Sequence, residues 1–220
     1  MKSRIEMGSL MIGGIANLVM AAAGWIAFYF SGSEALLLDG NFSFILFITG
    51  VAAVGITLAD RITKKKKSLE MLYIVIKGLL ILFVIVIAVI NNIQKIYEFI
   101  LGHEVGQLKT GIIGYYIALV VTICFSLSFF YRNQNQKINN TSRLLDTEAK
   151  ASMIDGFMSS GTGIALIFVG LIEPGSSLNF MLYIGDSIAV LLLSICMVKE
   201  PIIMIFNAIT PPSVHNVIPT

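Results

Sequence analysis

The stretch Ser33-Glu34-Ala35-Leu36-Leu37-Leu38-Asp39-Gly40-Asn41-Phe42-Ser43 places a carboxylate near the start of an apolar run that continues to Ala59. Residues 151–160 repeat this order, because Asp155 is followed at once by a glycine and four positions later by a serine. A charge at bilayer depth costs at least about 2.5 kcal/mol on insertion scales, so a carboxylate within a membrane span marks a candidate functional site. Two carboxylates in matching contexts indicate one shared site.

The composition is that of a chain built for lipid. Of its 220 residues, 56% are hydrophobic and 13% are charged, whereas an ordinary soluble domain is about 25% charged. The net charge of +2 is too small to indicate binding to nucleic acid. Cys124 and Cys196 both lie inside apolar runs, so we expect no disulfide framework and no thiolate metal site. We interpret both as small buried hydrophobic side chains.

The apolar segments predict an all-α, polytopic membrane protein with six transmembrane helices and both termini cytoplasmic. A helix needs about 20 apolar residues to cross about 30 Å of hydrocarbon. The N-terminal segment is longer than the apolar core of a cleavable signal peptide. We expect a membrane domain over residues 1–208 and a short cytoplasmic tail over 209–220. The six spans are 10–30, 35–59, 69–90, 111–131, 145–172 and 178–198.

The distribution of Lys and Arg predicts the orientation, since cytoplasmic loops carry an excess of both. With the N-terminus inside, the external segments hold only Lys95 and Lys109. The run 64–67 is interpreted as an anchor at anionic headgroups. The cytoplasmic positions are Lys2, Arg4, Arg61, Lys64, Lys65, Lys66, Lys67, Arg132, Lys137, Arg143 and Lys199. We therefore expect a multi-pass protein of the cell's inner or plasma membrane.

Four further polar features lie in or near the spans. Lys77 lies about two turns from the cytoplasmic end of its segment, and we expect its ammonium group to snorkel to the interface. Lys150 and Asp146 are four residues apart and are expected to pair at the cytoplasmic mouth. Asp186 either caps a polar network or reaches the outer interface. Residues 132–142 are rich in Asn and Gln and are interpreted as a flexible connector.

Several of these motifs, in this order, resemble the membrane domain of the cation diffusion facilitator family. The stretch 32–40 resembles the start of that family's second helix, and the resemblance extends over roughly residues 1–208. Six spans with both ends inside also agree. The remaining matching positions are Asn17 in the first helix, Glu70 at the head of the third, and Glu148, Ala149, Asp155, Ser159 and Gly161 in the fifth.

The resemblance implies a proton-coupled exporter of divalent metal ions such as zinc, manganese, iron, cobalt or magnesium, usually a homodimer. Typical members bind the metal with four ligands, two on helix two and two on helix five. Aligned without gaps, these positions are Phe42, Leu46, Ala151 and Asp155 here, so only Asp155 carries a ligand. The family's C-terminal metal-sensing domain has no counterpart within the expected boundaries.

Residue chemistry indicates how a metal site could still form. Asp39 lies three residues before Phe42 and shares roughly its helix face, with Ser43 four residues further on. Ser159 likewise follows Asp155 by four residues. Asp39, Asp155, Ser43 and Ser159 would form an oxygen-rich site, which suits hard cations such as Mg²⁺ or Mn²⁺ better than Zn²⁺. Gly40 and Gly156, next to the two aspartates, would either let another backbone approach closely or soften the helix there.

The expected mechanism is alternating access with cation–proton antiport. Two carboxylates in a low-dielectric cavity repel each other, which favours a proton on one of them until a divalent cation displaces it. No glycine-rich phosphate loop indicates an ATP-driven pump, and no nucleophile–base pair indicates an enzyme. The alternative is a transport-inactive membrane partner or scaffold subunit derived from the same family, in which Asp39 and Asp155 form a structural hydrogen-bonded pair.

Overall fold

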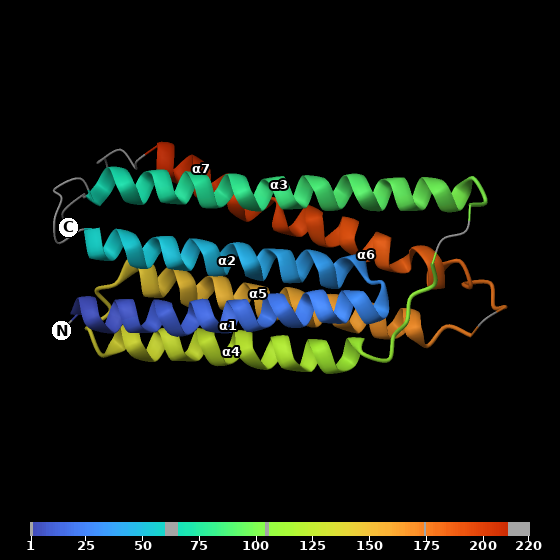
Figure 1. The fold of residues 1–220 in the computed structure, drawn as a ribbon, viewed down its shortest axis with the longest axis horizontal. Coiled ribbons are helices and arrows are strands. Elements are labelled where there is room, and N and C mark those ends of the chain that lie inside the picture. Colours follow the sequence, from blue (N-terminus) through green and yellow to red (C-terminus); the bar gives the residue numbers. More distant parts are fainter. Residues whose placement is uncertain (1, 60–65, 104–105, 174, 211–220) are drawn as a thin grey trace, which may run out of the picture.

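The computed structural model describes residues 2–59, 66–103, 106–173 and 175–210, and within these ranges it is helical with no strand. Figure 1 shows the helices running along one long axis. They are α1 (Lys2–Ser31), α2 (Glu34–Ala59), α3 (Lys66–Ile100), α4 (Ile113–Gln136), α5 (Arg143–Gly170), α6 (Met181–Met197) and α7 (Lys199–Ile209). The prediction of an all-α fold is confirmed.

The helices form two groups. In the first, α1 packs against α2, α4 and α5, and α4 packs along α5. In the second, α3 packs against both α6 and α7, which lie together along one side of the bundle in Figure 1. The two groups meet where α2 contacts α3 and α6, and where α5 contacts α6. The candidate site lies at this junction.

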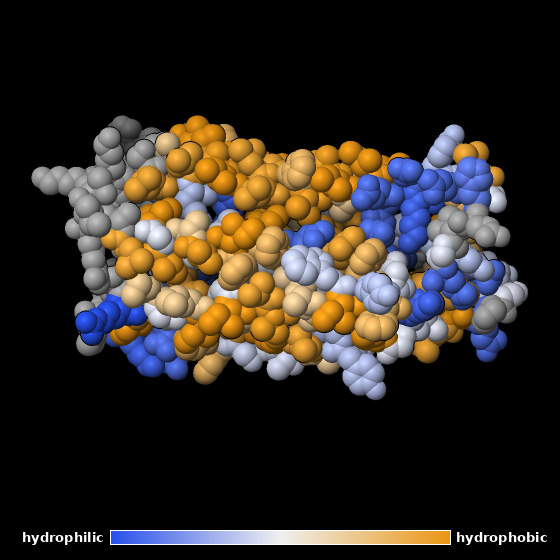
Figure 2. Space-filling view, viewed as in Figure 1, coloured by the Kyte–Doolittle hydropathy of each residue, from blue (hydrophilic) through white to orange (hydrophobic). Residues whose placement is uncertain are grey.

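Six helical segments of the described chain are long and apolar enough to cross a membrane, as predicted. They are Arg4–Ser31, Glu34–Ile56, Met71–Ile100, Ile113–Gln136, Leu144–Gly170 and Met181–Phe206. The sixth includes α6 and most of α7. Large apolar side chains such as Phe83, Phe129 and Ile195 are exposed. On the face seen in Figure 2, hydrophobic residues form a broad belt and hydrophilic residues gather toward the ends. This surface is suited to hydrocarbon and makes the chain a multi-pass membrane protein.

Several predicted boundaries differ from those of the helices, most of all at the start of α1 and the end of α3. Helix α1 begins at Lys2 and α3 extends to Ile100, because helices continue past the apolar stretch that hydropathy detects. Beyond residue 90, polar residues continue α3. The side-chain amide of Asn92 there donates to the Ala88 carbonyl, one turn earlier, at 2.8 Å. At the other end of the chain, α7 follows α6 directly, beyond the end of the sixth predicted span at residue 198.

The two short connectors are made by residues that tolerate left-handed backbone. Gly32 has φ +70° and directly follows α1, so the chain turns tightly and α2 begins two residues later. Asn139 and Asn140 have φ 58° and 54°, a conformation that Asn adopts more readily than most residues. Asn135 Oδ1 accepts a hydrogen bond from the Ser142 amide at 3.1 Å. Of the predicted connector, residues 132–136 belong to α4, and the residues after them form a short hydrogen-bonded turn before α5.

The N-terminal end of α1 and the C-terminal end of α7 lie at the same end of the bundle (Figure 1). The assignment of this end to the cytoplasm stays a prediction from the Lys and Arg distribution. Residues 60–65 and 211–220 and the side chains of Lys66, Lys67 and Glu70 lie outside the described part of the chain. The predicted headgroup anchor and most of the predicted tail therefore also lie outside it.

Helices α1 and α2 touch backbone to backbone beside Asp39. A Cβ atom added at Gly24 would lie 2.6 Å from the Gly40 Cα, closer than any real contact. Small residues permit such approaches between helices in lipid. The approach that the sequence predicted for Gly40 is confirmed, with Gly24 as its partner.

Comparison of Gly24→Ala with Gly14→Ala, on the same helix, tests this contact. At Gly14 the nearest atom to an added Cβ is in the Phe47 side chain at 3.8 Å, an ordinary contact. We expect Gly24→Ala to be less stable than Gly14→Ala by about 1–3 kcal/mol, the usual cost of overpacking. Both variants replace a helical glycine with alanine and gain the same helix propensity. The difference between their unfolding free energies therefore measures the cost of the contact at Gly24. Denaturant unfolding in detergent measures it, and equal stability would contradict the packing.

Candidate metal-cation site

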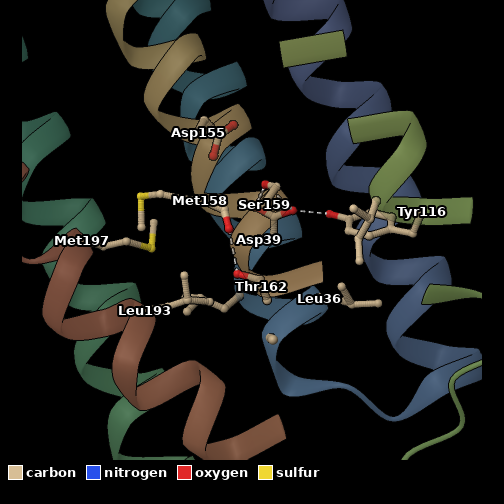
Figure 3. Close-up of a pocket in the computed structure, with 12 residues that line it drawn as sticks. Leu36, Asp39, Tyr116, Asp155, Met158, Ser159, Thr162, Leu193 and Met197 are labelled. Carbon is tan, nitrogen blue, oxygen red and sulfur yellow. Dashed lines mark hydrogen bonds between the residues drawn. The ribbon is translucent and has the colours of Figure 1, made fainter. Parts of the chain in front are cut away.

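A small cavity lies between the two helix groups, and Figure 3 shows the side chains around it. The space open to the centre of a water molecule is about 20 Å³, and about 10–15 Å³ suffices for one water. The cavity therefore has room for a single water or a small ion. Its walls are Ala35, Leu36, Leu38 and Asp39 of α2, Tyr116 and Ile117 of α4, Asp155, Met158, Ser159 and Thr162 of α5, and Leu193 and Met197 of α6.

Donors from two other helices hold the carboxylate of Asp39. The Tyr116 hydroxyl of α4 donates to Asp39 Oδ2 at 2.6 Å. The Ser159 hydroxyl of α5 lies 3.3 Å from Oδ1 and 3.4 Å from Oδ2. Figure 3 shows Asp39 and Ser159 side by side, with Tyr116 reaching in from α4. The carboxylate thus joins three helices at the cavity wall.

Asp155 lies one helical turn from Ser159 on α5 and is 5% exposed. The Cys124 thiol of α4 donates to its Oδ2 at 3.3 Å. The same sulfur lies 3.6 Å from the Met20 thioether of α1. Asp155 therefore lines the cavity and also contacts a sulfur atom that is not part of the cavity wall.

The glycine after Asp155 lies against side chains of α4, whereas the sequence predicted the approach of another backbone or a softened helix. A Cβ atom at Gly156 would lie 3.1 Å from the Cys124 Cβ. The absence of a side chain lets α4 approach α5 here and brings the thiol within reach of the Asp155 carboxylate. Gly40 lets the backbone of α1 approach α2 beside Asp39.

The structure brings three of the four predicted site residues to one cavity. Asp39, Asp155 and Ser159 line it, and Ser43 is not among its wall residues. Ser43 is fully buried, and its hydroxyl has no hydrogen-bond partner within the described part of the chain. The described residues contain no cluster of three or more His, Cys, Asp or Glu side chains able to hold a metal. That Asp39, Asp155 and Ser159 bind a cation, with or without Ser43, stays a prediction.

Two residues next to the carboxylates, Tyr116 and Cys124, were not predicted as part of the site. Both belong to the inward-facing stripe of α4, spaced three or four residues apart, which also contains Ile113, Val120, Leu127 and Tyr131. This spacing of residues in the sequence could have predicted that the Tyr116 hydroxyl and the Cys124 thiol face the interior of the bundle. The sequence cannot predict which aspartate each one meets. Cys124 is buried as expected, whereas Cys196 is exposed on α6.

Lys77 of α3 does not snorkel, contrary to the prediction. It is 5% exposed, and its ammonium group lies 3.3 Å from Glu148 Oε1 of α5. Glu148 determines where the Lys77 side chain points, and no pattern near Lys77 in the sequence indicates this partner. The predicted pair of Lys150 with Asp146 is confirmed at 2.7 Å, and both side chains are exposed.

Asp186 of α6 caps the N-terminus of α2. Its carboxylate accepts from the Ser33 hydroxyl and the Glu34 amide, both at 2.6 Å, and from the Ala35 amide at 3.3 Å. The first amides of a helix have no partner within the helix, and the helix dipole favours a negative charge there. Of the two alternatives for Asp186, the structure shows the capped polar network.

The fold and its cavity define a polytopic helical membrane protein with ionisable side chains enclosed between its helices. A sequence model of the cation efflux transmembrane domain matches residues 10–210. The chain therefore belongs to the cation efflux family, whose members are transporters that carry metal cations across membranes. The comparison with curated proteins returned no match.

The Lys77–Glu148 pair and the Lys150–Asp146 pair allow a matched comparison on the same helix. Glu148→Gln leaves a buried ammonium group without its opposite charge, which typically costs about 3–5 kcal/mol. Asp146→Asn breaks an exposed pair worth about 0–1 kcal/mol. We expect the first variant alone to lower the unfolding midpoint in detergent strongly. Similar midpoints for the two variants would contradict the burial of the Lys77–Glu148 pair.

Proposed function

We propose that this chain is a secondary transporter that carries a divalent metal cation in exchange for protons, with Asp39 and Asp155 as its central ligands. One observation carries the proposal: a carboxylate from each half of the chain lines the same small cavity. The transported cation is the substrate, and no resident cofactor is required.

The donor set around the cavity supports a cation as its occupant. An ionised carboxylate buried in a bundle surrounded by lipid needs compensating charge or hydrogen bonds. Asp39 receives hydrogen bonds from Tyr116 and Ser159, and Asp155 receives one from Cys124. No Lys, Arg or His lies among the described residues that line the cavity. A bound cation would supply the missing positive charge.

Proton exchange follows from the same carboxylates. Each must lose any bound proton before it can coordinate a metal, so metal and protons compete for the site. Binding on one side of the membrane would release protons there, and protonation on the other side would release the metal. Apparent metal affinity should therefore fall as the pH is lowered.

A second candidate function, a transport-inactive partner or scaffold, is favoured by the residues at the family's ligand positions. On α2, Phe42 packs against the apolar cluster of Ile45, Ile81 and Ile85. Leu46 is buried and Ala151 has no donor atom. In this alternative, Asp39 and Asp155 only hold the helices together. Dimerisation stays a prediction from the family resemblance.

Transport in proteoliposomes distinguishes the two functions. Sealed vesicles with a pH-sensitive dye inside are given Mn²⁺, Mg²⁺, Zn²⁺, Co²⁺ or Fe²⁺ in turn. We expect at least one cation to drive a proton flux, and Asp39→Asn and Asp155→Asn to reduce it at least about tenfold. We expect this loss because each amide removes a negative charge from the ligands of the cation.

Asp146→Asn, on the same helix as Asp155 but exposed, serves as the matched control and should transport like the wild type. Thermal unfolding in detergent checks that all three variants fold. Unchanged flux in both cavity variants would overturn the assignment of the site. No flux for any cation, together with no metal binding to the purified protein, would establish the scaffold alternative.

A further inference from the structure

We propose that Glu148 of α5 is an entry ligand for the transported cation, and that the tethered ammonium group of Lys77 occupies it while this end of the bundle is closed. The inference rests on the proposed transport function and adds a second binding position to it. Glu148 is not among the described residues that line the cavity. Its ligand would be a hydrated divalent cation on the way to the cavity.

Glu148 belongs to the face of α5 that carries the cavity residues. It precedes Asp155 by seven residues, which is two turns and about 10 Å along the helix axis. Ser159 follows on the same face, and both Asp155 and Ser159 line the cavity. Between Glu148 and Asp155 this face carries Ala151 and Ser152, whose side chains are small. The face therefore leads from Glu148 to the cavity without a bulky side chain of its own.

The positive partner of Glu148 comes from the other helix group. Lys77 Nζ of α3 lies 3.3 Å from Glu148 Oε1, and the two residues are 5% and 9% exposed. Within the described part of the chain, α3 packs against α2, α6 and α7 but not along α5. Two long side chains thus bridge α3 and α5 where the helices themselves do not pack. Movement of α3 away from α5 would leave the carboxylate without its opposite charge.

An apolar cluster lies beside this pair and reaches the cavity wall. It consists of Ile45, Ile81 and Ile85, with Met197 packed against it. Ile81 lies one turn from Lys77 on α3, and Met197 also belongs to the cavity wall. The cluster and the ion pair therefore separate the cavity from the end of the bundle at which α3 begins (Figure 1).

The chemistry of the pair indicates what would replace Lys77. An ionised carboxylate without an opposite charge is strongly unfavourable inside a bundle surrounded by hydrocarbon. A cation that arrives when Lys77 is withdrawn carries the same sign as the ammonium group and would neutralise the same carboxylate. When the cation moves on to Asp155, Lys77 would return to Glu148. A negative group at a narrow, low-dielectric entrance also raises the rate at which cations arrive.

Removal of both charges tests this role. Lys77→Met combined with Glu148→Gln leaves no unpaired buried charge, which is the main cost of changing one partner alone. Initial flux into proteoliposomes is measured against concentration, separately for Mn²⁺, Mg²⁺, Zn²⁺, Co²⁺ and Fe²⁺. We expect kcat/KM to fall at least about tenfold, because a charged entrance raises arrival rates by about 10–10³. Isothermal titration of the purified protein should give an unchanged equilibrium affinity, since Asp39 and Asp155 are retained.

Two further variants separate entry from structural pairing. Lys150→Met combined with Asp146→Asn removes an exposed pair from the same end of α5 and should transport like the wild type. Lys77→Glu combined with Glu148→Lys keeps an ion pair but moves the carboxylate from α5 to α3. We expect this exchanged pair to remain slow, because its carboxylate is no longer on the face that leads to Asp155. Thermal unfolding in detergent checks folding, and the exchanged pair carries the test if the uncharged pair does not fold.

Wild-type kcat/KM in the uncharged or the exchanged pair would overturn the entry role and leave the contact a structural one. A parallel loss of equilibrium affinity would also overturn it, because Glu148 would then act through the central ligands. In both cases flux by the wild type leaves the proposed function standing. No flux by the wild type for any of the five cations would overturn the proposed function, and the entry role with it.

Discussion

Charged side chains inside this bundle must find their partners on other helices, because the surrounding hydrocarbon offers none. Asp39, Asp155, Asp186 and Lys77 all satisfy this constraint across helix boundaries. Leaving such a group unpaired would cost several kcal/mol, so these contacts determine which helices lie next to one another more strictly than apolar packing does. Apolar packing between helices in lipid is permissive, since lipid tails are as apolar as the side chains.

Glycines let two pairs of helices come close beside the aspartates. At Gly40 the backbone of α1 comes against α2, and at Gly156 α4 comes against α5. Only the second approach brings a donor, because Cys124 of α4 donates to Asp155, whereas the donors to Asp39 come from α4 and α5. A larger residue at position 156 would therefore move Cys124 away from its carboxylate.

The sequence predicted the helical class, the six spans and the two carboxylates, because hydropathy and the cost of buried charge are local properties. It did not predict the partner of any buried charge. Lys77 was expected at the lipid interface because Glu148 lies 71 positions away. Cys124 was interpreted as a small apolar residue because nothing near it in sequence is charged. Ser43, in the same register as Ser159, does not line the cavity, since helix rotation depends on packing that the two matching stretches do not share.

Two polar contacts join the same pair of helix groups at opposite ends of the bundle (Figure 1). At one end Lys77 of α3 holds Glu148 of α5, and at the other Asp186 of α6 holds the first turn of α2. Opening of the bundle at one end alone would break one of these contacts and leave the other in place. A passage open at both ends at once would require the loss of both.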